Sequence, residues 1–187
     1  MSAKQGGSGN KLNIRRITLY ALTVVLCLVV GYLESLLSTA LIAVAPGVKI
    51  GLSNAVALTL ICSGDFKGAW AVNITRICLS ALLFGSPVSF LFSLAGGVAS
   101  TATACLLSKF KSVSPVGISL AGGVVHNIFQ LLAAIAFVGV GVIYYMPALI
   151  AFGALCGALC GVLANLIIKK NKDKRNILVY NISVLSK

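Results

Sequence analysis

Six apolar runs separated by short polar connections constrain the fold of this chain more than any other feature. The runs cover residues 17–40, 50–63, 68–84, 88–107, 116–138 and 146–168. A helix of about twenty apolar residues crosses a hydrocarbon core of about 30 Å, and most of the runs approach or exceed that length. The chain is 59% hydrophobic and only 10% charged, a balance that a soluble domain of this length does not accommodate. We therefore expect an all-α polytopic membrane protein, a six-transmembrane-helix bundle in a lipid bilayer.

The positions of lysine and arginine predict the orientation of these helices. If the amino terminus is cytosolic, every basic residue except Lys49 and Arg76 falls on the inner side of the membrane. The positive-inside rule then places both termini in the cytosol of a multi-pass protein of the cell (plasma) membrane. We interpret the net charge of +12 as a topology signal rather than as a nucleic-acid binding surface. The first run is too long for the apolar region of a signal peptide, so we expect a retained span.

The sequence divides into one membrane domain and two terminal segments. Residues 1–16 contain a Gly-Gly-Ser-Gly stretch and are expected to form a flexible basic cytosolic tail. Residues 17–168 form the six-helix transmembrane domain, in which the short second run is tilted, bent or preceded by a re-entrant stretch. Residues 169–187 are expected to form a basic cytosolic C-terminal tail near the anionic inner leaflet.

A few polar residues interrupt the apolar runs. Ionisable groups in the hydrocarbon are costly and usually face a cavity or a partner, so they mark candidate functional sites. At a rise of about 1.5 Å per residue, the polar groups lie from the midplane outward, which predicts a substrate pocket that opens to the outside. The candidate substrate-binding residues are Glu34, Asn54, Asn73, Arg76, His126, Asn127 and Gln130.

Each of these residues also has a structural interpretation. Glu34 and Arg76 carry opposite charges and could neutralise one another within the bundle. His126 could be a hydrogen-bonded core histidine. The amides could join helices by hydrogen bonds, which is the commoner use of such side chains in membrane bundles.

Small residues recur at positions that favour close helix packing. A Leu-Ala-Gly-Gly-Val sequence occurs at 94–98 and again at 120–124, and a Ser-Pro pair that suits a helix start precedes each copy. The two copies are compatible with an inverted transporter repeat or with simple packing of neighbouring helices. The sixth run carries glycines at four-residue intervals, which favour packing within the chain or against a partner. The candidate packing residues are Gly96, Gly97, Gly122, Gly123, Gly153, Gly157 and Gly161.

Several kinds of chemistry lack the residues that they need. The sequence contains no phosphate-binding loop for ATP, no metalloprotease or serine-hydrolase motif, and no Cys/His metal spacing. Prenyl transfer from diphosphates needs clustered carboxylates for Mg²⁺, and the two aspartates, Asp65 and Asp173, lie far apart. We interpret the six cysteines as buried apolar side chains. The sequence therefore predicts a protein that is not an enzyme and that has no catalytic residue, cofactor or metal ion.

Several motifs occur in an ordered series along the chain. They are Gly-Tyr-Leu-Glu-Ser at 31–35, Pro-Gly-Val-Lys-Ile-Gly-Leu-Ser-Asn at 46–54, Arg76, Leu-Phe-Gly at 83–85, Ser-Leu-Ala-Gly-Gly at 93–97, Ser-Pro-Val-Gly at 114–117 and His-Asn at 126–127. Over about residues 15–168 the chain resembles the bacterial Gx transporter family. Members of that family are often labelled heptaprenyl diphosphate synthase component I, and the family resembles the S components of energy-coupling factor transporters.

The resemblance implies a subunit that captures a small-molecule substrate from outside and works with a membrane coupling protein and cytosolic ATPases. S components commonly dock through an Ala-xxx-Ala face in the first helix, which Ala21 and Val25 do not reproduce here. The leading hypothesis is a transporter subunit for a small vitamin-like or isoprenoid-related molecule. The alternative hypothesis is a non-catalytic membrane accessory subunit of a heptaprenyl diphosphate synthase.

Overall fold

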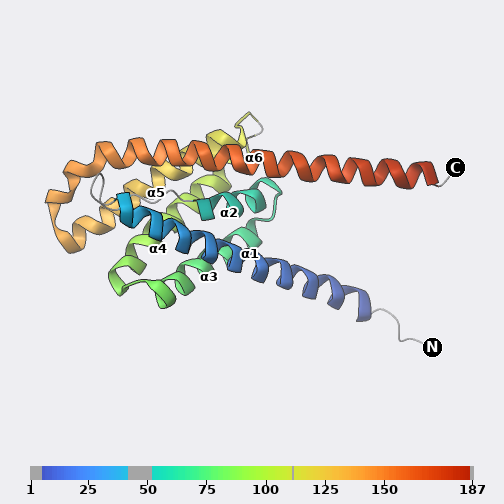
Figure 1. The fold of residues 1–187 in the computed structure, drawn as a ribbon, viewed down its shortest axis with the longest axis horizontal. Coiled ribbons are helices and arrows are strands. Elements are labelled where there is room, and N and C mark those ends of the chain that lie inside the picture. Colours follow the sequence, from blue (N-terminus) through green and yellow to red (C-terminus); the bar gives the residue numbers. More distant parts are fainter. Residues whose placement is uncertain (1–5, 42–51, 111, 186–187) are drawn as a thin grey trace.

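The computed structural model describes residues 6–41, 52–110 and 112–185, and all of its regular structure in these ranges is helical. Figure 1 shows the elements in chain order. They are α1 (Gly6–Leu41), α2 (Leu52–Cys62), α3 (Phe66–Phe84), α4 (Pro87–Leu107), α5 (Pro115–Val138), the short 3-10 helix η1 (Val140–Tyr145) and α6 (Met146–Leu185). Each apolar run of the sequence thus corresponds to one α-helix.

Four of these helices are long and apolar enough to cross a membrane. The qualifying segments are Arg16–Glu34 in α1, all of α4, all of α5, and Val140–Lys170, which includes most of α6. The apolar part of α2 is shorter, and α3 carries Lys67, Asn73 and Arg76 along its 19 residues. The described part of the chain is therefore a membrane protein with four long apolar helices, and the crossing by α2 and α3 stays a prediction.

Helix starts and ends follow the local sequence. The Ser86 hydroxyl accepts a hydrogen bond from the Ser89 N–H at 3.2 Å, and Ser114 does the same for Gly117 at 3.2 Å. Proline occupies the first turn after each of these two caps, as the sequence predicts. Gly139 ends α5 with a φ of 100°, a conformation that glycine adopts without steric cost.

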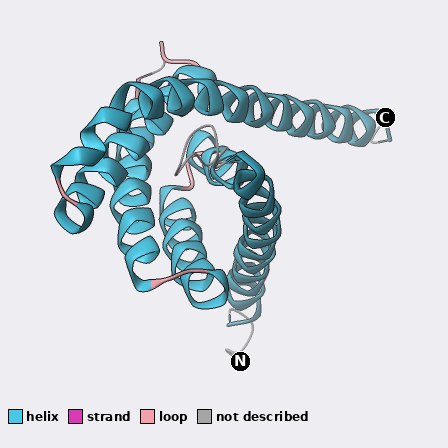
Figure 2. Cartoon of the chain, turned by 60° about the vertical axis from the view of Figure 1, so that its left-hand side comes forward, coloured by secondary structure: helices cyan, strands magenta, loops and turns pink. Residues whose placement is uncertain are grey.

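Two helices run further than the apolar runs predicted. The first begins at Gly6 and the last continues to Leu185, so both extend into segments for which the sequence predicted tails. No proline or glycine follows Gly161, and a helix with no such stop signal continues beyond its apolar part. In Figure 1 both extensions project from the same end of the bundle, where the two termini lie. Figure 2 shows the same chain turned, with short loops between its helices.

The α5–α6 contact is built from glycine. A Cβ atom at Gly157 would lie 2.7 Å from the carbonyl oxygen of Ser119, and one at Gly161 would lie 2.6 Å from the Cα atom of Val116. Gly123 and Gly153 lie against each other in the same way. Side chains at these positions would separate the two backbones, so the glycines allow a close helix approach.

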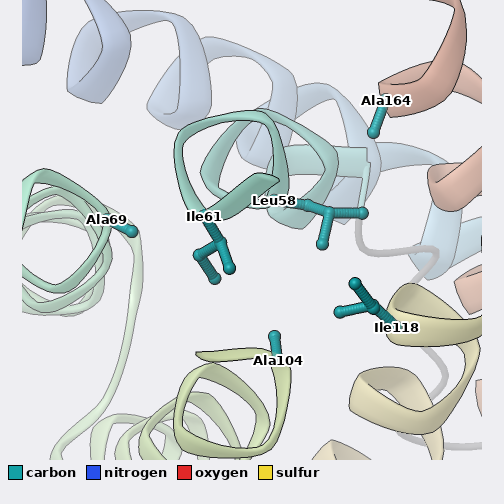
Figure 3. Packing of buried hydrophobic residues seen from close by; sticks show 6 residues of the cluster. All are labelled: Leu58, Ile61, Ala69, Ala104, Ile118 and Ala164. Carbon is teal, nitrogen blue, oxygen red and sulfur yellow. The ribbon is translucent and has the colours of Figure 1, made fainter. Parts of the chain in front are cut away.

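An apolar cluster fills the bundle near the end that carries the termini. Figure 3 shows its six buried members, which come from five helices: Leu58, Ile61, Ala69, Ala104, Ile118 and Ala164. A smaller cluster of Val24, Cys27 and Val72 joins α1 to α3. Alanine supplies half of the larger cluster, which lets the helices converge here. The polar residues lie further along the bundle, toward the opposite end.

Candidate small-molecule binding site

A hydrogen-bond network around Arg76 forms the centre of the site. The guanidinium donates to the Ser53 hydroxyl at 2.7 Å, to the Asn54 side-chain oxygen at 3.1 Å and to the Asn73 side-chain oxygen at 2.9 Å. Arginine presents its five N–H groups in a rigid planar fork, so three acceptors from two helices fix its orientation. All three acceptors are uncharged, and they hold the guanidinium without neutralising it.

Asn73 links this network to α4. Its side-chain nitrogen donates to the Gly97 carbonyl oxygen at 3.1 Å and to the Thr101 hydroxyl at 2.8 Å. Because these acceptors take the amide nitrogen, the amide oxygen must point toward Arg76. Asn73 is only 2% exposed, so the loss of these bonds would leave buried polar atoms. Asn73 therefore orients Arg76 together with Ser53 and Asn54, and it ties this network to α4.

Glu34 lies on α1 and is 7% exposed. It lines the same cavity as Arg76 of α3 and as Cys156 and Cys160 of α6. A carboxylate at this depth is costly unless it has a compensating charge or polar group. The two ionisable groups that the sequence singled out therefore belong to one site.

Two candidate residues on α5 contact the neighbouring helices: Asn127 contacts α6, and His126 contacts α4. The Asn127 side-chain nitrogen donates to the Leu149 carbonyl oxygen at 2.6 Å, which ties α5 to the first turn of α6. His126 lies against Gly96, where an added Cβ would come within 3.0 Å of the imidazole ring. Asn127 acts as a link between helices in this arrangement, and the His126 ring fills the space that glycine leaves.

These side chains line a cavity of about 380 Å³, to which all six α-helices contribute. Its volume falls in the range of small-molecule sites, which run from about 300 to 1,000 Å³. Leu58, Ile61 and Ile118 of the apolar cluster bound it on the side of the termini. The lining continues to Phe84 and Gly85 at the exposed α3–α4 turn. The cavity thus approaches the surface at the end of the bundle opposite to the termini.

Six of the seven candidate substrate-binding residues line the cavity. They are Glu34, Asn54, Asn73, Arg76, His126 and Asn127. Gln130 is not among the lining residues, because the lining on α5 ends at Asn127 and Gln130 lies about one turn beyond it. The glycines Gly97, Gly122, Gly123, Gly153 and Gly157 also line the cavity, while Gly96 and Gly161 contribute only to packing.

Sequence reasoning missed the hydroxyl groups and an aromatic pair. The hydroxyl-bearing lining residues are Ser53, Ser80, Ser89, Ser93, Ser100, Thr101 and Ser119. Ser93, Gly97 and Ser100 recur at helical spacing, which was a usable signal for one polar face of α4. The rings of Tyr32 and Phe84 also line the cavity, with their centroids 4.8 Å apart. Nothing in the sequence indicates that these two rings meet.

The sequence was compared with known protein families. The sequence model of the family described as heptaprenyl diphosphate synthase component I matches residues 23–167 of the 187. The chain belongs to this family. The match confirms the family to which the ordered motifs pointed. Neither a curated protein nor a solved structure matched the sequence.

In this component I family member, the matched region contains every residue that lines the cavity, from Gly31 to Cys160. Within the described ranges, no group of three or more His, Cys, Asp or Glu side chains could hold a metal ion. Mg²⁺-diphosphate chemistry uses several carboxylates, whereas Glu34 is the one carboxylate among the described residues of the lining. The size and the polar lining of this cavity suit the binding and orientation of a small molecule.

A second polar cluster lies at the end of the bundle near the termini. The Tyr20 hydroxyl donates to one Asp65 carboxylate oxygen at 2.5 Å, and the Gly68 N–H donates to the other at 3.0 Å. The hydrogen bond from Tyr20, followed by the bond from Gly68 and the charge of Arg16, lowers the pKa of the Asp65 carboxyl, and partial desolvation opposes this. Asp65 therefore caps α3 and ties it to α1.

Proposed function

We propose that this component I family member is the membrane-embedded substrate-binding subunit of a transporter, resembling an S component, for a small vitamin-like or isoprenoid-related molecule. One observation carries the proposal: a cavity inside the helix bundle contains a guanidinium that neutral acceptors hold in a fixed orientation. A buried charge with such support is the usual mark of a substrate pathway in a membrane protein.

The cavity suits capture from one side of the membrane. The apolar cluster closes the end near the termini, and the lining reaches the exposed α3–α4 turn at the other end. The basic residues favour placing the termini, and hence the closed end, in the cytosol. Substrate would then enter from outside. Reporter fusions at Asp65 and Gly141 test this orientation, and a cytosolic signal at Gly141 would reverse it.

Release of the substrate into the cell requires a source of energy. The connections between the helices are short, and the sequence has no phosphate-binding loop. We propose that a membrane coupling protein with cytosolic ATPases supplies this energy. The binding subunit would change conformation when its partner hydrolyses ATP.

Mass spectrometry of the purified protein tests the proposed function. The protein is extracted from native membranes in a mild detergent, and the small molecules that it retains are identified. Arg76→Ala should lose the retained molecule and keep its elution profile. Arg16→Ala is the matched control, because Arg16 is exposed on α1 and does not line the cavity. A wild-type protein that retains no small molecule would contradict the proposal.

The family description favours a second candidate function, a non-catalytic membrane accessory subunit of a heptaprenyl diphosphate synthase. Crosslinking and co-purification from native membranes distinguish the two. Recovery of ATPase subunits supports transport, whereas a stable complex with a soluble prenyl synthase subunit supports the accessory role. In either case we expect the purified chain alone not to elongate an allylic diphosphate, because its described residues cluster no carboxylates for Mg²⁺.

A further inference from the structure

Helix α4 has two chemically different faces. Ser93, Gly97 and Ser100 recur at intervals of four and three residues, and all three line the polar cavity. Ala99 and Thr103 lie on another face and line a separate groove between α4 and α5. The other described residues of that groove are leucine, valine, alanine and phenylalanine. The serine hydroxyls of α4 thus gather on the side of the cavity.

Hydroxyl groups outside the cavity lining bond to their own helices. The Thr103 hydroxyl donates to the carbonyl oxygen of Ala99 at 2.9 Å. The Ser108 hydroxyl donates to the carbonyl oxygen of Cys105 at 2.9 Å. The same bond, to a carbonyl three or four residues earlier, is made by Thr18, Thr23, Thr59 and Ser63. A serine or threonine within a helix often satisfies its hydroxyl locally in this way.

The hydroxyls of Ser93, Ser100 and Ser119 differ from these. Within the described ranges, none of these three side chains makes a hydrogen bond, although each lines the cavity. Their oxygen atoms are not sealed by neighbouring groups and stay open to the cavity. A hydroxyl in this state can donate and accept, so it can bond to a molecule that enters.

These three hydroxyls are spread along the cavity. Ser93 lies in the second turn of α4, which begins at the open end of the bundle. Ser100 lies seven residues, or about 10 Å, further in. Ser119 lies in the second turn of α5, next to Ile118 of the apolar cluster that closes the other end. A molecule in the cavity therefore meets a hydroxyl toward either end and between them.

We propose that Ser93, Ser100 and Ser119 bind the substrate directly, and that the substrate is a compact molecule with uncharged hydrogen-bonding groups spread over its surface. Hydroxyl, carbonyl and amide groups are of this kind. The inference rests on the proposed function, and it names the class of substrate. A serine hydroxyl can rotate to donate or to accept, so it pairs with any of these groups. Contacts at different depths require polar groups on more than one side of the ligand.

The same arrangement disfavours an isoprenoid chain as the ligand of this cavity. The polar groups of such a ligand lie at one end, and its hydrocarbon part would cover some of the three hydroxyls. Covering a polar group without giving it a partner costs free energy. The groove between α4 and α5 differs in this respect, because the one hydroxyl among its described residues, that of Thr103, is already bonded.

Quantitative mass spectrometry of the retained molecule tests the three contacts. Ser93→Ala, Ser100→Ala and Ser119→Ala are purified in the same mild detergent as the wild-type protein, and the amount retained per protein is measured. Ser108→Ala is the matched control, because Ser108 bonds to its own helix and lies outside the lining. The loss of one neutral hydrogen bond weakens binding by about twofold to tenfold, so each cavity variant should retain less than the control. The inference is overturned if two or more of the three variants retain as much as Ser108→Ala.

The structure of the retained molecule tests the class of substrate. A molecule with hydrogen-bonding groups on more than one side supports the inference. A molecule whose polar groups lie at one end of a hydrocarbon chain overturns the inference and leaves the proposed transport function intact. Retention of no molecule contradicts the proposed function itself.

Thiol labelling tests the hydroxyl face without any ligand. Ser100→Cys and Ala99→Cys place a thiol at neighbouring positions of nearly equal depth, the first in the cavity and the second in the apolar groove. A small cationic methanethiosulfonate reagent is added to native membranes, and peptide mass spectrometry measures modification at each position separately from the native cysteines. A thiol reacts as its thiolate, which forms in a polar cavity and not in lipid, so Ser100→Cys should react at least about tenfold faster. Equal rates would show that polar molecules do not reach this face, and would overturn the inference.

Discussion

Replacing Asn73 by leucine should both destabilise the bundle and misplace Arg76. Leucine has the same branching and the same number of side-chain heavy atoms as asparagine but is larger, so the change removes the hydrogen bonds and adds some overpacking. Asn73 donates two bonds to neutral acceptors on α4 and accepts one from the Arg76 guanidinium. Asn73 is 2% exposed, so the loss of these bonds would leave polar groups without partners at a buried position.

The expected loss follows from these three bonds. Hydrogen bonds between side chains in membrane bundles contribute about 0.6 kcal/mol on average. A hydrogen bond to a charged group contributes about 1.5–3 kcal/mol. Two of the first kind and one of the second give a loss of about 3–4 kcal/mol. At about 2–4 °C per kcal/mol for a chain of this size, the unfolding temperature should fall by at least about 6 °C.

Thermal unfolding in detergent micelles measures this loss, with ligand retention as the second readout. Asn165→Leu is the matched control, because Asn165 lies half-buried on α6 and outside the cavity lining. If Asn73→Leu costs no more stability than Asn165→Leu, the amide does not hold α3 to α4. If Asn73→Leu retains the ligand at the wild-type level, the amide does not orient Arg76.

Three further predictions address packing, charge and pH. Gly157→Ala should cost about 1–3 kcal/mol by overpacking the α5–α6 contact, whereas Gly141→Ala, with open space around it, should cost much less in the same unfolding assay. If Glu34 and Arg76 stabilise one another, the Glu34→Ala/Arg76→Ala double variant should recover part of the stability that Arg76→Ala loses in the unfolding assay. Additive losses of stability would mean that the two side chains do not stabilise one another. The pKa of Asp65 is lowered by its hydrogen bonds, so its stabilising contribution is complete above the unfolded value of about 3.9 and is lost as the pH falls below it. Asp65→Asn should therefore weaken the fall in unfolding temperature as the pH drops from about 4 toward the lowered folded-state pKa, and an unchanged acid profile would show that the cap does not titrate there.

The helix boundaries were predictable because local chemistry decides them. Ser86 and Ser114 cap α4 and α5, and each precedes a proline that can only begin a helix. The extension of α6 to Leu185 was not predicted. An apolar run indicates the part of a helix that lies in lipid, whereas the helix itself continues until a stop signal such as glycine or proline ends it. Hydropathy therefore located the helices better than it located their ends.

The site was predictable in composition and less so in geometry. A buried Arg76 needs compensation, and that requirement brought Glu34 and the neighbouring amides into consideration. Helical spacing alone grouped Gln130 with His126, although the cavity ends before Gln130. The bonds from Ser53 and from Asn73 depend on how α2, α3 and α4 meet, and a single sequence carries no signal for that meeting.

The glycine contact between α5 and α6 also decides which parts of this protein can move. Backbone meets backbone at Gly123 and Gly153, so sliding one helix along the other would drive carbonyl groups into Cα atoms. These two helices therefore behave as one stiff body, with α4 attached to it. Among the described residues, α1 packs only against α2 and α3, and it carries Glu34. The hinge that opens the cavity should thus lie on the side of α1. We expect α1, with Glu34, to move while α5 and α6 stay in place.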